Sequence, residues 1–257
     1  MIENLKNYHV FVAGGLGEIG SQLVQKLTCY DAAITILYSS KKYSKRLINL
    51  KDNKNVKIIQ TDYCNYNNLY EDLFRNCIPD KTNCLISTVG SGKTNENYPY
   101  SKYEIDRLWN INYFSNRNLA TAISQILMNY KEFNSEGKAA HVFTSSIASS
   151  INVNAPFEYC ASKAALENII KSLSKYISPD QRINSISPGH IYTPKGTWGI
   201  KISENESLVR KMIEETIPLK RLGNTDEISY VYLFLISSFS SYITGTNITI
   251  DGGISIN

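Results

Sequence analysis

Residues 8–20 read YHVFVAGGLGEIG, a short apolar run that leads directly into a glycine-rich turn. A helical pattern follows the turn, because apolar residues recur at Leu23, Val24 and Leu27. Closely spaced glycines let the backbone approach a pyrophosphate, which the unpaired N–H groups of a helix N-terminus bind. In isolation the motif also fits a plain tight turn. A second apolar run at residues 33–38, where a strand–helix–strand unit needs its next strand, favours a dinucleotide site.

Further short apolar runs continue this pattern along the chain. They lie at residues 56–60, 84–87, 140–144, 182–187 and 246–250, with helical patterns between them. Continuous apolar strands that alternate with helices are typical of a parallel sheet covered on both faces. We therefore predict an α/β fold, a Rossmann-type doubly wound parallel sheet of about seven strands with helices on both faces, in a single domain over residues 1–257. Residues 190–218 interrupt the alternation and indicate a substrate lid or a plain surface excursion.

Composition excludes several classes of protein. The 257 residues are 42% hydrophobic and 19% charged, which is typical of a globular chain, and the net charge of +4 is too small and scattered to favour nucleic acid or a membrane surface as partner. The five cysteines show no Cys-x-x-Cys spacing, so we expect neither a disulfide framework nor a metal site. With no long apolar run and a strand pattern near the N-terminus, we expect no membrane span, no signal peptide and a cytoplasmic location.

The end of the second apolar run bears on the choice of cofactor. It reads SSKK at residues 39–42, with Lys45 and Arg46 close behind. An NAD site usually has a carboxylate here for the ribose 2′-hydroxyl, whereas the hydroxyl of Ser39 and the charge of Lys41 suit a 2′-phosphate. We therefore favour NADP(H) over NAD(H). The alternative is a solvated basic start to a helix, and Glu18 in the glycine turn counts against a phosphate nearby.

A second motif lies between Ser146 and Lys163. Ser146 follows a predicted strand, and Tyr159 and Lys163 are four residues apart in a helical pattern, so both side chains share one face. A phenol titrates near about 10, and a neighbouring ammonium favours the phenolate and lowers that pKa. A lower pKa brings proton exchange between the phenol and a substrate oxygen closer to neutral pH. Ser146, at the strand end facing this helix, is placed to hydrogen-bond the same oxygen. Without its context, the pair would be an ordinary exposed helical pair.

These landmarks, in this order, resemble the short-chain dehydrogenase/reductase superfamily in its compact single-domain branch, over essentially the whole chain. The motifs that carry the resemblance are Ser146, Tyr159 and Lys163, the segment NIN that ends at Asn112, PGHIYTP at 188–194 and DGG at 251–253. The resemblance implies that Tyr159 exchanges a proton with the substrate oxygen and that Ser146 orients the carbonyl. Lys163 would lower the pKa of Tyr159 and hold the nicotinamide ribose, and Asn112 would hold a water in a proton relay.

The resemblance also implies two binding sets. The cofactor set is Gly14, Leu16, Gly17, Ile19, Ser39, Lys41, Asp62, Tyr63, Gly90, Tyr159, Lys163, Pro188, Gly189, Ile191 and Thr193. The substrate set is Ser146, Ile147, Tyr159, His190 and Trp198, with Ser91, Phe157 and Tyr192 as further lining. The substrate would be a small carbonyl or alcohol, and the assembly a homodimer or homotetramer.

Two departures from the family pattern leave alternatives open. Gly14, Gly17 and Gly20 have the spacing of the family's longer branch, with Glu18 where the compact branch has glycine, and STVG at 87–90 replaces the usual Asn-Asn-Ala-Gly. The longer branch includes nucleotide-sugar epimerases and dehydratases, but their substrate domain needs more residues after the sixth strand than this chain has. The other alternative to an oxidoreductase is a non-catalytic dinucleotide-binding sensor. We predict an NADP-dependent oxidoreductase that interconverts a carbonyl and a secondary alcohol.

Overall fold

A seven-stranded parallel sheet forms the centre of the computed structural model, which describes residues 4–39, 53–94, 96–134 and 139–256. The strand order is β3-β2-β1-β4-β5-β6-β7, and every neighbouring pair is parallel. The strands are β1 (Tyr8–Ala13), β2 (Ala33–Tyr38), β3 (Val56–Gln60), β4 (Thr82–Ser87), β5 (Ala139–Thr144), β6 (Gln181–Pro188) and β7 (Asn247–Ile250). This order is that of a doubly wound Rossmann fold, so the fold predicted from sequence is confirmed.

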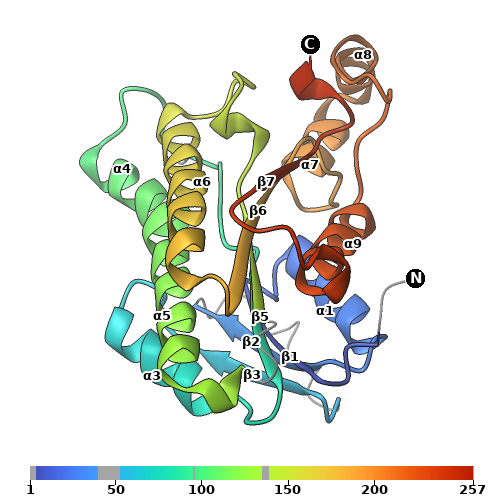
Figure 1. Cartoon of the computed structure of the whole chain (residues 1–257). Coiled ribbons are helices and arrows are strands. Elements are labelled where there is room, and N and C mark those ends of the chain that lie inside the picture. The colour runs from blue at the N-terminus through green and yellow to red at the C-terminus, as the bar shows by residue number, and fades with distance from the viewer. Residues whose placement is uncertain (1–3, 40–52, 95, 135–138, 257) are drawn as a thin grey trace.

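Helices cover both faces of the sheet (Figure 1). On one face lie α3 (Tyr66–Asn76), α5 (Ser115–Asn129) and α6 (Phe157–Ile177), and on the other lie α1 (Glu18–Thr28) and α9 (Thr225–Ile236). The remaining helices are α4 (Lys102–Trp109), a π-helical turn η3 (Asn110–Phe114), α7 (Thr197–Glu204) and α8 (Glu206–Thr216), with short 3₁₀ turns at Lys131–Phe133, Ile147–Ser149, Ser238–Ser240 and Ile254–Ile256.

The two cores follow from the alternation of side chains along each strand. In β1, Phe11 and Ala13 pack under α5 and α6, whereas Val10 and Val12 pack under α1 and α9. All four are fully buried, because both faces of the sheet are covered. Burial on both faces leaves the carboxyl-terminal edge of the sheet as the place where polar side chains meet.

The segment between β6 and α9 contains more helix than its sequence indicates. Residues 196–199 read as a loop with two glycines, yet α7 begins at Thr197. Gly199 fits there because a Cβ would lie 2.3 Å from the carbonyl oxygen of Thr193, so the helix packs directly on the preceding turn. This packing, which no local pattern reveals, places α7 beside β6 and β7, with α8 beyond it near the C-terminus (Figure 1).

Candidate active site

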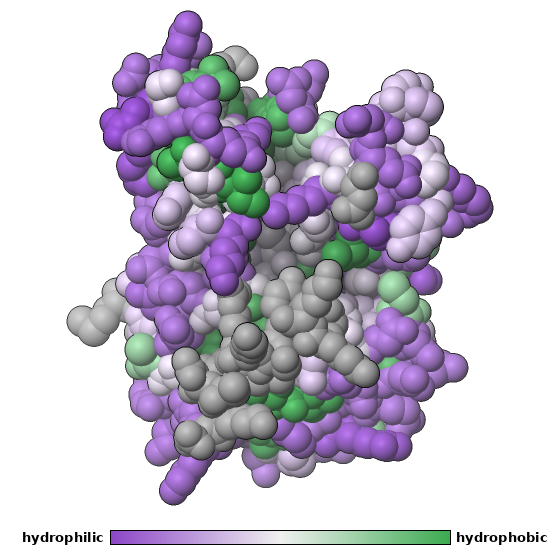
Figure 2. All heavy atoms as spheres, turned by 180° about the vertical axis from the view of Figure 1, so that it is seen from behind, coloured by the Kyte–Doolittle hydropathy of each residue, from purple (hydrophilic) through white to green (hydrophobic). Residues whose placement is uncertain are grey.

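A cleft of about 370 Å³ lies beyond the carboxyl ends of β4, β5 and β6. Figure 2 shows one face of the molecule hollowed near its centre, between two upper lobes. The cleft is lined by Ser146, Tyr159 and Lys163, the three residues that the second sequence motif singled out. Ligands of open α/β sheets bind at this edge, where loops rather than strands present the side chains.

Tyr159 and Lys163 project from one face of α6, and the ammonium lies 6.0 Å from the centroid of the phenol ring. Burial raises the pKa of Tyr159 above its usual value, while a hydrogen bond with Ser146 lowers it. The direction is opposite to the one expected from sequence. The reason is that removal from water disfavours the phenolate more than the surrounding polar groups favour it.

Lys163 is only 2% exposed, and its Nζ donates a hydrogen bond to the carbonyl oxygen of Thr144 at 2.7 Å. Burial lowers the pKa of Lys163 to about 7, and Glu167, one turn further along α6, acts to raise it. An ammonium in this range exchanges protons readily at neutral pH. At neutral pH both the charged and the neutral form of Lys163 are therefore populated.

Glu167 ties three segments together next to Lys163. One carboxylate oxygen, Oε1, accepts hydrogen bonds from the hydroxyls of Ser145 at 2.6 Å, Ser149 at 2.5 Å and Ser187 at 2.9 Å. Ser145 directly follows β5, Ser149 lies in the short turn after it, and Ser187 lies at the end of β6. Sequence reasoning missed Glu167, although its position four residues after Lys163 places it on the same helical face.

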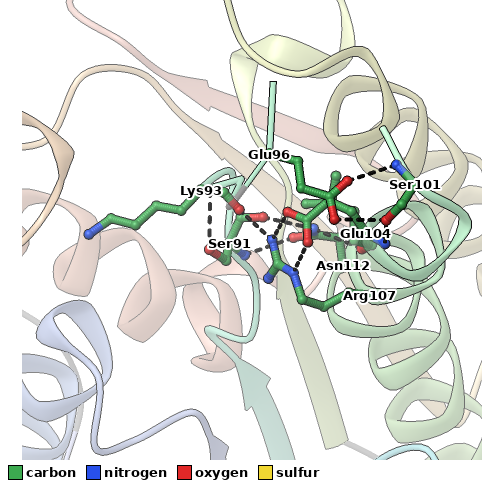
Figure 3. Close-up of polar contacts among 8 residues, drawn as sticks. Ser91, Lys93, Glu96, Ser101, Glu104, Arg107 and Asn112 are labelled. Atoms are coloured by element: carbon green, nitrogen blue, oxygen red, sulfur yellow. Dashed lines mark hydrogen bonds and ion pairs between the residues drawn. The ribbon is translucent and has the colours of Figure 1, made fainter. Parts of the chain in front are cut away.

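Asn112 occupies the π-helical turn between α4 and α5 and is fully buried. Its Oδ1 accepts from the Ser91 amide at 2.9 Å, and its Nδ2 donates to the carbonyl oxygens of Ser91 and Leu108, each at 2.9 Å (Figure 3). Gly90 separates Asn112 from Lys163. A Cβ at this glycine would lie 2.7 Å from Lys163 Nζ and 2.9 Å from Asn112 Oδ1, so the absent side chain leaves space for both.

A buried ion pair supports the same wall of the cleft. Glu104 is fully buried, and Arg107 donates to it from Nε at 2.9 Å and from Nη2 at 2.7 Å. Arg107 Nη2 also donates to the carbonyl oxygen of Lys93 at 2.5 Å, so that the guanidinium lies between the helix and the loop (Figure 3). Gly92, within this loop, faces the Tyr159 ring, which a Cβ would approach to 3.4 Å. The network thus holds the loop against the phenol.

The glycine turn forms a second cavity that continues from the cleft. It measures about 150 Å³, is lined by Gly14, Leu16, Gly17, Tyr38, Ser39, Tyr63 and Ile111, and shares Thr88, Val89 and Gly90 with the main cleft. Gly17 caps α1 without a side-chain hydrogen bond, and Gly14 has φ +75°, a conformation that favours glycine. The open helix N-terminus and the bare turn fit a dinucleotide pyrophosphate.

Ser39, Lys41, Asp62 and Tyr63, which were predicted to bind the cofactor on its adenosine side, differ in their position relative to this cavity. Ser39 and Tyr63 line it, and Tyr63 is buried with its hydroxyl donating to the Leu37 carbonyl oxygen at 2.6 Å. Asp62 lines a neighbouring hollow and accepts from the Cys64 amide at 2.9 Å. Lys41, like Lys42, Lys45 and Arg46, lies outside the described residues.

At the other end of the cleft, the residues predicted to bind cofactor or substrate fall into two groups, those that line the cleft and those that do not. Ile19, Pro188, Gly189, His190, Ile191, Trp198 and Ser91 line it together with the central three residues. Four predicted residues do not: Thr193 and Ile147 are buried in packing, and Phe157 and Tyr192 are exposed outside the cleft. The binding roles of all these residues stay predictions.

Lys201 and Asn154 line the cleft and were not predicted. Lys201 lies three residues after Trp198 on α7, and its Nζ stands 4.8 Å from the centroid of the Trp198 ring system. Trp198 in turn packs against His190, with ring centroids 4.2 Å apart and ring planes tilted by 38°. The helical spacing of Trp198 and Lys201 would have revealed the pair if residues 197–204 had been predicted as helix.

The fold and the cleft define a dinucleotide-dependent enzyme in which a tyrosine and a lysine share one helix face. The family model described as enoyl-(acyl carrier protein) reductase matches residues 15–255. The chain belongs to the short-chain dehydrogenase/reductase superfamily, a family of NAD(P)-dependent oxidoreductases that act on CH–OH and C=O groups.

Similar proteins span almost the whole chain. The sorbose reductase sou1 of Schizosaccharomyces pombe is 28% identical, over 97% of this chain and 96% of its own. The 3alpha-hydroxysteroid dehydrogenase of Mediterraneibacter gnavus is 27% identical, over 98% of each chain. Among solved structures, the NADPH-dependent 3-quinuclidinone reductase of Rhodotorula rubra superposes with a TM-score of 0.81 at 24% identity, over 99% of this chain and 93% of its own. None of the helices in the described part of the chain is long and apolar enough to cross a membrane.

Proposed function

We propose that this protein is an NADP-dependent ketone reductase that interconverts a carbonyl and a secondary alcohol, with Tyr159 as the acid and base. The observation that carries the proposal is the convergence of Ser146, Tyr159 and Lys163 in a cleft continuous with the glycine turn. Three relatives named as a reductase or a hydroxysteroid dehydrogenase support the class of reaction. Residues 190–218 would cover the substrate, since α7 contributes Trp198 and Lys201 to the lining.

Each residue has a role that follows from its contacts. When bound, the nicotinamide supplies or accepts the hydride at the substrate carbon. Tyr159 gives its proton to the carbonyl oxygen during reduction, and Ser146 donates a hydrogen bond to the same oxygen. Lys163, with a pKa of about 7, is the group from which the phenolate regains its proton. Asn112 fixes the Ser91 backbone and so the wall opposite Lys163.

NADP(H) is favoured over NAD(H) for two reasons. No carboxylate follows β2 in the sequence where an NAD site would use one, and the solved relative from Rhodotorula rubra is named as NADPH-dependent. Ser39, the last described residue after β2, lines the cavity of the glycine turn. A kcat/KM for NADPH that is at most equal to that for NADH would contradict this part of the proposal. A homodimer or homotetramer and a cytoplasmic location stay predictions.

The central test is Tyr159→Phe, assayed with NADPH and a panel of ketones. We expect turnover to fall by a factor of about 100 or more, because a general acid contributes that much, while NADPH affinity stays nearly native. Tyr192→Phe is the matched control, since Tyr192 is exposed outside the cleft, and its activity should be unchanged. An active Tyr159→Phe enzyme would refute the assignment.

Two other functions predict different results in the same assay. A dinucleotide-binding sensor would bind NADPH tightly and turn over no carbonyl. A nucleotide-sugar epimerase or dehydratase would convert a sugar nucleotide with little net oxidation of the cofactor. Either outcome would replace the reductase proposal.

A further inference from the structure

The charge of the cleft lining is one-sided. Its ionisable residues are Tyr159, Lys163, His190 and Lys201, and no Asp or Glu belongs to the lining among the described residues. Burial, followed by the charge of Lys201, lowers the pKa of His190 to about 4, with Asp251 acting in the opposite direction, so this ring is uncharged at neutral pH. The charged residues of the lining are therefore positive at neutral pH, namely Lys201 and the protonated fraction of Lys163.

Lys201 is held at the mouth of this cleft by its contact with Trp198. The Nζ lies 4.8 Å from the centroid of the Trp198 ring system, within the range of a cation–π contact, and the His190 ring contacts Trp198 with ring centroids 4.2 Å apart. A lysine stem that rests on an aromatic ring has fewer conformations to lose when a ligand binds. The ammonium is thus partly ordered before any anion arrives.

Nearby carboxylates do not neutralise this ammonium. None of the ion pairs recorded within residues 4–39, 53–94, 96–134 and 139–256 involves Lys201. Asp251, the acid closest to His190 in its electrostatic effect, accepts hydrogen bonds from the backbone amides of Gly253 at 2.9 Å and Ser255 at 2.7 Å. The Asp251 carboxylate is thus hydrogen-bonded within the turn after β7.

We propose that the substrate of this enzyme is a carbonyl compound with an anionic group, which Lys201 binds at the mouth of the cleft while the carbonyl meets Ser146 and Tyr159. The inference rests on the reductase activity proposed above. A cleft with low-dielectric walls and charge of one sign concentrates the field, attracts substrates of opposite charge and disfavours cationic ones. Because Lys201 is exposed, the preference is moderate and weakens with added salt.

The test compares ketones that differ in charge alone. Acetoacetate, 4-oxopentanoate and 4-acetylbenzoate are each assayed against their primary amides, with NADPH and with native protein, Lys201→Gln and Lys195→Gln. Lys195 is an exposed cation in the same segment that does not line the cleft, which makes it the matched control. We expect native kcat/KM to favour at least one carboxylate over its amide by about tenfold. Lys201→Gln should abolish this preference through KM, because a uniform binding contact is lost, and Lys195→Gln should keep it.

The possible results separate this inference from the reductase proposal. Equal use of carboxylates and amides by the native enzyme would overturn it, as would a Lys201→Gln enzyme in which both members of a pair lose activity equally. If no ketone is reduced, the reductase proposal fails. Thermal unfolding with each acid and amide then decides the inference alone: a shift specific to the acids and lost in Lys201→Gln supports it, and the absence of such a shift overturns it.

Discussion

Replacement of Gly90 by alanine is expected to damage catalysis far more than folding. The backbone of Gly90 does not have a positive φ, so alanine can adopt the same backbone conformation without strain. Its Cβ, however, would lie 2.7 Å from Lys163 Nζ and 2.9 Å from Asn112 Oδ1. Non-bonded contacts of this kind settle at roughly 3.5 Å, so the ammonium must move by roughly 1 Å. That movement strains or breaks the 2.7 Å hydrogen bond to Thr144.

The two consequences differ in size. Loss of one charged hydrogen bond costs about 2 kcal/mol of unfolding free energy, which lowers the Tm of a chain of this length by roughly 4–8 °C. A displacement of about 1 Å in a catalytic group lowers kcat by about 100-fold. We therefore expect a folded protein that binds cofactor and has lost most of its turnover.

The assay follows oxidation of NADPH with a ketone that the native enzyme reduces, alongside thermal unfolding. Gly92→Ala is the matched control, because its Cβ would stand 3.4 Å from the Tyr159 ring, an ordinary contact. We expect its kcat to change by less than about threefold. If Gly90→Ala is folded and has a near-native kcat, the position of Lys163 Nζ does not limit the reaction, and the role assigned to this lysine is wrong.

Two further predictions concern pH. The pKa of Lys163 is 10.5 in its unperturbed state and about 7 in the fold. Between these pH values the unfolded chain therefore holds a proton that the native chain has released. The free energy of unfolding should rise from pH 7 to 10.5 by up to about 1.4 kcal/mol per pH unit, relative to Lys163→Met. Urea unfolding across this range measures the difference, and parallel curves for the two proteins would contradict it. Burial lowers the pKa of His9 and of His141 to about 4 from 6.5, so stability should decline as pH falls from 6.5 toward 4, by up to about 1.4 kcal/mol per unit for each ring. A free energy of unfolding that stays constant over this interval would show that these rings take up protons in the folded state.

Much of the fold was predictable from sequence because it rests on local patterns. Short apolar runs that alternate with helical patterns predicted all seven strands of the sheet, and the four-residue spacing predicted that Tyr159 and Lys163 share a face of α6. Strand ends such as Ser146 and Pro188 line the cleft, since parallel strands bring their carboxyl ends to one edge.

Other features depend on contacts between segments far apart in the chain. Sequence spacing suggested a lowered pKa for Tyr159, yet burial raises it, because desolvation depends on everything packed around the phenol. The contacts of Glu167 join three serines that only the folded sheet brings together. Thr193 is buried and does not line the cleft, and Lys201 was missed because α7 forms by packing on a turn. Sequence by itself thus identified the residues to which we assign the proton chemistry. The tertiary structure decided their charge states and the charge of the cleft, because desolvation and the field of neighbouring groups act through space rather than along the chain.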